Sequence, residues 1–276
     1  MKNFTSILSV FLLVFVLGYI DGYEKAYDET CMSRFIDKMN EKAKELGMHN
    51  THFADPSGLL YENIGTVDDV ISLLDACVSN DIIMSIWNQD SSFISIQDVK
   101  HKERIVLMHN TFLSDSIAPY NVLGRKTGSD GYVFNLAICL GNSSDRYSSC
   151  VILNASSEVE RLSALKTICD DKCIASDRYS VCYINSGGGK FSLNEQEKVP
   201  LLSITKLMTV LVALEYENNL NRIIEIKECD IMRGSGIEIN AGECLSFYDA
   251  IKATLISSSN TCSYAISREV GCNINE

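Results

Sequence analysis

Helix-like and strand-like patterns alternate along this chain, and the strand-like ones gather in its middle. Apolar residues at helical spacing predict a helix over residues 31–46, ended by Gly47, and Thr66 is a candidate N-cap for a helix over 67–79. Strand patterns lie within residues 91–195, and no low-complexity linker divides the chain. We therefore expect one α+β domain.

Two runs in that region are candidates for buried strands, residues 131–140 and 150–153, and residues 178–193 predict a hairpin around three successive glycines. Ser157 and Glu160 have the spacing of a capping box, which marks the start of a helix. The helices expected in the second half of the chain cover residues 157–168, 203–217 and 247–257.

The acidic composition excludes several classes of protein. The 276 residues include 24 Lys and Arg against 36 Asp and Glu, which gives a net charge of −12. Nucleic-acid binding needs a basic surface, so we expect no nucleic-acid partner, and electrostatic docking on anionic lipid is disfavoured. The four histidines form no HExxH pattern and the eleven cysteines no CxxC pattern, so no metal site and no cofactor are predicted.

The first residues indicate where the protein acts. Lys2 precedes an apolar run over residues 7–16, a pattern typical of a secretory signal peptide, which we assign to residues 1–22. The run is short for a membrane span, and an uncleaved N-terminal anchor that attaches the protein to a membrane is the alternative. Both interpretations predict an extracytoplasmic protein, in which disulfides can form.

Ser203 and Lys206 carry the first chemical motif, S-x-x-K, at the start of an apolar helix. Positions i and i+3 share a helix face, so the serine hydroxyl and the lysine amine would meet. Serine needs an adjacent base to act as a nucleophile, and a lysine can serve when burial or a neighbouring cation lowers its pKa. Alone, the motif is better explained by a serine N-cap followed by a solvated lysine.

Two shorter motifs accompany the first. Ser258 and Asn260 form S-x-N at the end of an apolar helix, and K-T-G at residues 126–128 comes just before the strand predicted at 131–140. Taken alone, S-x-N is explained by a helix cap and K-T-G by a surface turn. Together with S-x-x-K, however, they form the set of motifs that penicillin-recognising serine enzymes share.

Longer blocks resemble the D-alanyl-D-alanine carboxypeptidases, the low-molecular-mass penicillin-binding proteins. PLLSITKLMT at residues 200–209 resembles their PxxSxTKxMT block, and FIDKMNEKA at 35–43 resembles their FxxxMNxKA helix. NTHFADPSGL at 50–59 resembles NTxFxxPxGL, and residues 234–243 are similar to the family's approach to S-x-N. The resemblance implies a β-lactamase/transpeptidase-like fold, with an antiparallel sheet flanked by helices and a helical subdomain.

The blocks stand in a different order from that family, in which S-x-x-K comes first and K-T-G later. Residues 23–169 resemble the family's C-terminal part, and residues 174–276 its N-terminal part. We interpret this order as a circular permutation, with one domain over 23–276 whose old ends are joined through about residues 170–177. The alternative is a fragment of a tandem array that holds two half-domains.

The resemblance implies a serine-type D-Ala-D-Ala carboxypeptidase at the cell envelope, a hydrolase that acts on peptidoglycan stem peptides and is inhibited by β-lactams. Ser203 would attack the carbonyl of a terminal D-Ala-D-Ala peptide and form an acyl-enzyme, while Lys206 takes the serine proton. Ser258 would relay a proton to the leaving amine. Asn260 would position the lysine and the substrate amide.

The K-T-G segment would bind the substrate in this scheme. Lys126 would supply positive charge for the substrate carboxylate, and Thr127 would hydrogen-bond it. Gly128 and Ser129 complete the segment. The backbone N–H groups of Ser129 and Ser203 would form the oxyanion hole.

Several features depart from the family pattern. The stretch after K-T-G, residues 129–131, is short, Thr261 stands where the family commonly has Asp, and eleven cysteines are unusual. Two other functions therefore stay open. One is a catalytically inactive homologue that binds muropeptides, and the other is a β-lactamase or esterase on the same fold.

A permuted domain also predicts which segments are neighbours. Cys31 and Cys272 would precede the same family helix on either side of the cut, so we expect a disulfide between them. Lys126 should lie across a cleft from Ser203. The predicted strands should form one antiparallel sheet with the 157–168 helix on it. The expected helical subdomain comprises the helices at 31–46, 67–79 and 247–269.

Overall fold

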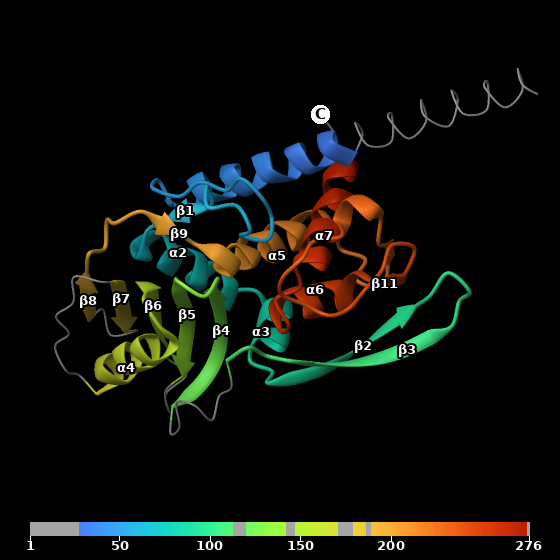
Figure 1. Ribbon diagram of the computed structural model, residues 1–276. Coiled ribbons are helices and arrows are strands. Elements are labelled where there is room, and N and C mark those ends of the chain that lie inside the picture. The colour runs from blue at the N-terminus through green and yellow to red at the C-terminus, as the bar shows by residue number, and fades with distance from the viewer. Residues whose placement is uncertain (1–27, 113–119, 142–146, 171–178, 186–188, 275–276) are drawn as a thin grey trace, which may run out of the picture.

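A five-stranded antiparallel sheet is the centre of the molecule, with helices on both of its faces (Figure 1). The predicted signal peptide at 1–22, and all of the connection predicted at 170–177 except its first residue, lie outside the part of the chain that the structure describes. The computed structural model describes residues 28–112, 120–141, 147–170, 179–185 and 189–274.

The sheet confirms the predicted α+β fold and its antiparallel pairing. The strand predicted at 131–140 begins three residues later, at Phe134, because the Asp130 carboxylate accepts the backbone N–H groups of Tyr132 and Val133 and closes a turn there. The strands lie side by side in the order β4 (Asn121–Ser129), β5 (Phe134–Gly141), β6 (Tyr147–Ala155), β7 (Ser180–Asn185) and β8 (Lys190–Leu193).

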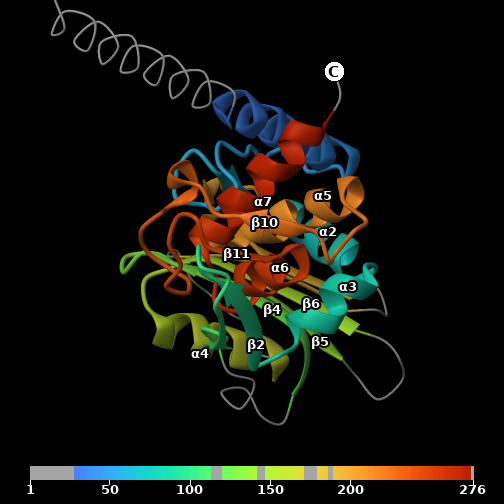
Figure 2. The ribbon, with the colours of Figure 1, turned by 90° about the vertical axis from the view of Figure 1, so that its right-hand side faces the viewer.

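Alternate residues of these strands enter two separate cores. Leu136 and Ile138 of β5 lie in a cluster with apolar residues of helix α4 (Glu158–Cys169), which covers one face. Ala137 and Cys139, one residue out of step, lie in the larger core on the other face. Figure 2 shows α4 on the opposite side of the sheet from α2, α5 and α6. The 157–168 helix therefore packs on the sheet as predicted.

Helix starts follow the predicted caps, with one change. Thr66 caps α2 (Val67–Val78) by accepting the N–H of Asp69, and Ser157 caps α4 by accepting the N–H of Glu160. The Glu160 carboxylate does not return to Ser157, as a capping box would require. It instead accepts the N–H and hydroxyl of Ser156.

The expectation that α2 joins the helical subdomain is wrong. Helix α2 packs across β5, β6 and β7 and against α5 (Thr205–Tyr216), on the face opposite α4. Its apolar stripe, with Val70 and Leu74 fully buried, belongs to the core that the sheet itself lines. The helical side of the molecule is built from α5, α6 (Phe247–Leu255), α7 (Asn260–Asn273) and the helix over 28–45.

A second sheet carries a long hairpin. Strands β2 (Ser91–Gln97) and β3 (Glu103–His109) form the hairpin that projects from the right of Figure 1. They extend a pair formed by β10 (Ile223–Glu225) and β11 (Cys244–Ser246), so that β3 is the edge. The sequence predicted strands in this region but not a separate sheet.

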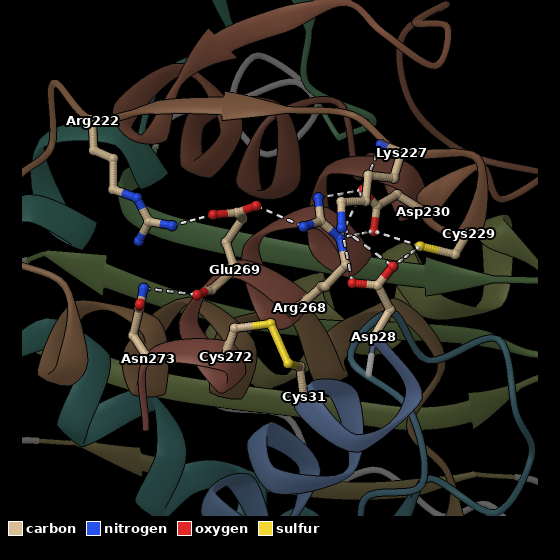
Figure 3. The surroundings of a disulfide bond; sticks show 10 residues. All are labelled: Asp28, Cys31, Arg222, Lys227, Cys229, Asp230, Arg268, Glu269, Cys272 and Asn273. Atoms are coloured by element: carbon tan, nitrogen blue, oxygen red, sulfur yellow. Dashed lines mark hydrogen bonds and ion pairs between the residues drawn. A yellow bond between two sulfur atoms is a disulfide. The ribbon is translucent and has the colours of Figure 1, made fainter. Parts of the chain in front are cut away.

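The ends of the described chain meet at a disulfide. Cys31, on the helix over 28–45, is bonded to Cys272 of α7, with 241 positions between them in sequence, and this pairing confirms the prediction (Figure 3). Nearby, Lys227 forms an ion pair with Asp28 at 3.0 Å. The two helices touch closely, because a Cβ on Gly271 would lie 1.9 Å from the Cys31 carbonyl oxygen.

Two short elements complete the fold. Strands β1 (Ile64–Gly65) and β9 (Val199–Pro200) pair and hold the chain that leads to Ser203.

Among the described residues, no single helix is both long and apolar enough to cross a membrane. Helices α2 and α3 (Asp81–Trp87) meet that test only together, across a bend of 101°.

Candidate active site

Ser203 lies at the junction where a short 3-10 turn, η2 (Leu202–Ile204), runs into helix α5. Lys206 is one turn further on, fully buried, with its Nζ 2.8 Å from Ser203 Oγ. Leu202 has a φ of +51°, which an L-residue adopts only under constraint. The constraint is visible at Gly58, where a Cβ would lie 1.8 Å from the Leu202 carbonyl oxygen. The serine is therefore held on a tightly packed turn.

The Lys206 amine has three hydrogen-bond partners among the described residues, and all are neutral. Besides Ser203, these are the Ser57 carbonyl oxygen at 2.7 Å and Asn260 Oδ1 at 2.8 Å. The two carbonyl oxygens can only accept hydrogen bonds, so they take two N–H groups. A neutral amine then has its lone pair left for the serine proton. The geometry thus suits a base as well as an ammonium.

Burial is the main cause that holds the pKa of Lys206 well below its usual range, and the charge of nearby Lys126 lowers it further. The Asp55 carboxylate acts in the opposite direction. A buried ammonium without an acidic partner is costly, so the lysine is poised to release its proton. This property is the one a base for a serine nucleophile requires.

Lys126 enters the same cluster from the sheet. It lies on β4, is buried, and its Nζ donates to Ser258 Oγ at 2.9 Å. Burial, with a further contribution from the Arg161 charge, lowers the pKa of Lys126 to about 7. Ser258, which has a φ of +59°, and Asn260 flank the start of α7. A hydrogen bond thus joins residues from the two halves of the chain.

The K-T-G segment is part of strand β4, not of a turn before the next strand. A Cβ on Gly128 would lie 2.8 Å from the backbone nitrogen of Ser203, so glycine lets the strand edge approach the serine. Thr127 Oγ1 lies 2.6 Å from Thr111 Oγ1, and Ser129 ends the strand in an exposed position. The strand after K-T-G, β5, contacts the turn at the start of the serine helix as expected, and β4 contacts the same turn.

A cavity of about 210 Å³ opens in front of the serine. Ser203, Asn260 and Ser129 contribute to its lining. Tyr61 and Asp130 line it as well, and the tyrosine hydroxyl donates to the aspartate carboxylate. The cavity thus has the serine hydroxyl and the end of the K-T-G strand on its walls, as a substrate site requires.

All eight predicted site residues lie in this region. Five of them are joined by hydrogen bonds in two groups, Lys206 with Ser203 and Asn260, and Lys126 with Ser258. Thr127, Gly128 and Ser129 follow along the β4 edge. No group of His, Cys, Asp and Glu suited to a metal ion occurs in the described part of the chain.

Sequence reasoning missed the residues that support Lys206 from the far side. Asp55 Oδ1 accepts the Ser57 N–H at 2.6 Å and its hydroxyl at 2.8 Å, and Asn63 donates to the other carboxylate oxygen at 2.8 Å. This turn directs the Ser57 carbonyl at the lysine. The signal in the sequence is the Asp-Pro-Ser-Gly run at 55–58, which lies within the block that resembles NTxFxxPxGL.

Comparison with known proteins divides the chain into two adjoining parts. Residues 30–156 match the family described as D-alanyl-D-alanine carboxypeptidase, and residues 161–276 match the β-lactamase enzyme family. No solved structure matches the chain.

Individual relatives carry a consistent name. The D-alanyl-D-alanine endopeptidase of Haemophilus influenzae is 39% identical over 96 residues, 34% of this chain and 31% of the relative. That of Pseudomonas aeruginosa is 36% identical over 89 residues, 32% and 29%. That of Escherichia coli is 52% identical over 40 residues, 14% and 13%. The matched part thus spans less than a third of these relatives. The chain is related to the D-alanyl-D-alanine carboxypeptidases over residues 30–156 and to the β-lactamase enzyme family over residues 161–276.

Proposed function

We propose that this protein is a serine-type D-Ala-D-Ala peptidase that cleaves peptidoglycan stem peptides through an acyl-enzyme, with carboxypeptidase activity on their free ends. One observation carries the proposal. The buried Lys206 amine, whose pKa is lowered by burial, lies 2.8 Å from Ser203 Oγ and has two fixed carbonyl acceptors for its own protons. A lysine with a lowered pKa can accept a proton at a pH at which an exposed lysine is already protonated.

The reaction then follows from the groups around the serine. Ser203 Oγ attacks the penultimate D-alanyl carbonyl as Lys206 takes its proton, and an ester forms while the peptide C–N bond breaks. Ser258, hydrogen-bonded to Lys126, relays to the leaving D-alanine amine the proton that Lys206 has taken from Ser203. Water hydrolyses the ester and restores the serine. The free N–H groups at the start of the serine helix stabilise the oxyanion.

We also infer that the chain is a circularly permuted single domain. Lys126 and Ser258, which come from opposite ends of the permuted order, are within hydrogen-bond distance in one chain. Strand β7 of the second half pairs with β6 of the first, as joined old termini would require.

The apolar run at 7–16 supports an extracytoplasmic location at the cell envelope, where the protein would be secreted or anchored.

A β-lactamase is less well supported than a peptidase. Rapid hydrolysis of a penicilloyl ester needs a base that activates water. The described lining of the Ser203 cavity contains no glutamate, and its aspartate, Asp130, already accepts the Tyr61 hydroxyl and two backbone N–H groups. We therefore expect a long-lived penicilloyl adduct.

Labelling with a fluorescent penicillin, combined with release of D-alanine from a linear stem peptide, tests this proposal. The wild-type protein should form a stable adduct and release D-alanine, and Ser203→Ala should do neither. Ser192→Ala, on the distant strand β8, is the matched control and should behave as wild type. Labelling that persists in Ser203→Ala would contradict the assignment. Binding of a muropeptide without any penicillin adduct would favour the catalytically inactive binding homologue.

A further inference from the structure

The hairpin of β2 and β3 has no part in the reaction derived above. It projects from the body of the molecule, and β3 is the outer strand of its sheet (Figure 1). The seven residues of β3 pair one-to-one with those of β2. The outer side of such a strand presents backbone N–H and C=O groups with which another strand can pair.

The other edges of the two larger sheets are protected against such pairing. Strand β8 is four residues long and begins with Lys190, and β10 is three residues long. Strand β4 has an irregular register between Val122 and Gly124, and it contacts the turn that carries Ser203. Strand β3 is longer than β8 and β10 and contains no lysine, proline or register shift. It is therefore the edge that opposes pairing least.

The outer face of the hairpin is apolar at its centre. Phe93 lies opposite Leu107 in the β2–β3 pair, and Ile105 is two positions away along β3, so the three side chains share one face. They are 61%, 47% and 62% exposed, respectively. On the other face, Ile94 and Met108 are buried in the larger core. Exposed apolar side chains on a projecting hairpin indicate an interaction surface.

Charge favours a second copy of this chain as the partner. The chain as a whole has a net charge of −12, so two copies repel each other over most of their surface. Residues 91–109 contain three Lys and Arg against two Asp and Glu, which gives a net charge of +1. The hairpin is thus a part of this acidic chain at which two copies can approach each other.

We propose that two copies of this chain associate through β3, in an antiparallel pair with its two-fold axis at Val106. This register pairs all seven residues of β3 with those of the second copy. It places Ile105 opposite Leu107 on the outer face, so apolar side chains meet. It also places Glu103 opposite His109, so a carboxylate meets an imidazole at each end.

Neighbouring registers lose this complementarity. An axis that falls between two residues would place outer-face side chains opposite inner-face ones. An axis at Ile105 would put Glu103 opposite Leu107, and an axis at Leu107 would put Ile105 opposite His109. Val106 is therefore the position at which the strand is complementary to itself. Because a pair of seven-residue strands makes a small interface, we expect a reversible dimer rather than a permanent one.

Sedimentation equilibrium of the whole chain with charge-reversal variants tests the proposal. Glu103→Lys places two cations opposite the two His109 side chains, and His109→Glu places two carboxylates opposite Glu103. Each variant should weaken the dimer by about tenfold. The double variant restores opposite charges across the axis, and the dimer should recover. Glu228→Lys, the same charge change at an exposed position outside the hairpin, is the matched control and should not weaken association.

A cysteine at the two-fold axis tests the register directly. Residues directly opposite each other in an antiparallel pair have Cα atoms about 4.5–5.5 Å apart, which a disulfide can span. Val106→Cys should therefore form a covalent dimer on mild oxidation. Ser92→Cys, on the same face but one strand away from the edge, should form no more covalent dimer than the wild type, in which Cys229 is already exposed.

Each failure has a definite meaning. A wild-type protein that stays monomeric overturns the proposal. A dimer that neither Glu103→Lys nor His109→Glu weakens is held by another part of the chain, such as the apolar run at 7–16, and also overturns it. If both single variants weaken the dimer but the double variant does not recover, or if Val106→Cys forms no more covalent dimer than Ser92→Cys, the axis at Val106 is wrong.

Discussion

The active site and the surroundings of the disulfide both contain buried cations, and the two regions hold them in opposite ways. At the active site, the hydrogen-bond partners of Lys206 and Lys126 that the structure describes are neutral oxygens. Near the disulfide, Arg268 of α7 donates to the carboxylates of Asp230 at 2.8 Å and Glu269 at 2.6 Å (Figure 3). Lysine and arginine are equally buried, but only the arginine has acidic partners.

The difference separates chemistry from stability. Burial lowers the pKa of both lysines, that of Lys126 to about 7, so neither amine is held as a permanent cation. Burial also disfavours the charge of Arg268, but its carboxylate partners outweigh this and raise its pKa, so it stays a permanent cation. A buried amine without an acidic partner can take part in proton transfer, whereas a guanidinium paired with carboxylates stabilises the contacts between elements of the fold. Removing each cation should therefore have different consequences.

The largest effect should come from removing the active-site cation. Lys206→Met deletes the base but keeps the apolar stem, and we expect the rate of penicillin acylation to fall by about 10⁴-fold or more, since nucleophile and base act as a unit. The melting temperature should not fall, because a buried charge without an acidic partner has been removed. Stopped-flow acylation and calorimetry measure the two effects. A mild loss of rate would point to another base.

Removing the paired cation should do the reverse. Arg268→Met leaves the Asp230 carboxylate, itself fully buried, without its partner, and we expect a loss of about 3–5 kcal/mol in the free energy of unfolding. The acylation rate of the folded fraction should match wild type. The double variant Arg268→Met/Asp230→Leu should recover much of the stability in urea unfolding. A variant that unfolds normally but acylates slowly would contradict the comparison.

Much of the fold could be predicted because its signals are local. Short apolar runs at 131–140 and 150–153 identified two strands of the central sheet, and Thr66 and Ser157 marked helix starts by cap chemistry that acts within one turn. The position of α2 could not be predicted. A helical stripe such as Val70 and Leu74 says which face is buried, but not whether a sheet or another helix covers it.

The active site shows the same limit. Ser203, Lys206 and Asn260 could be identified because side-chain chemistry at fixed spacing leaves a pattern in the sequence. The Ser57 carbonyl oxygen, which accepts a hydrogen bond from Lys206, is a backbone atom that any residue could provide. No residue type therefore marks it in the sequence. The contact of Thr111 with Thr127 depends on how the hairpin strand leads into β4, which only the tertiary structure shows.

Removing the disulfide should lower the free energy of unfolding by a smaller amount and should leave the acylation reaction unchanged. Replacing Cys31 and Cys272 together by Ser opens the link between the helix over 28–45 and α7. We expect unfolding to become easier by about 2–4 kcal/mol, with penicillin acylation unchanged at low temperature. Cys229→Ser, which changes an exposed free thiol in the same region, is the control and should have little effect. Slowed acylation of the folded double variant would mean that the two regions are coupled.

The smallest expected effect is on pH dependence, and it distinguishes the two regions without any loss of fold. The pKa of Lys126 is lowered to about 7 by burial and by Arg161, and the proposed contact with the substrate carboxylate needs its protonated form. As pH rises above about 7, the amine loses its charge, so KM for a linear peptide should rise, by up to about tenfold for each pH unit. A peptide with an amidated C-terminus should show no such rise. Arg268→Met should leave the profile unchanged, because the raised pKa of that guanidinium keeps it charged throughout. If KM for the peptide with a free C-terminal carboxylate stays constant from pH 6 to pH 9, Lys126 does not titrate in this range. Burial without an acidic partner would then not suffice to make this cation reactive.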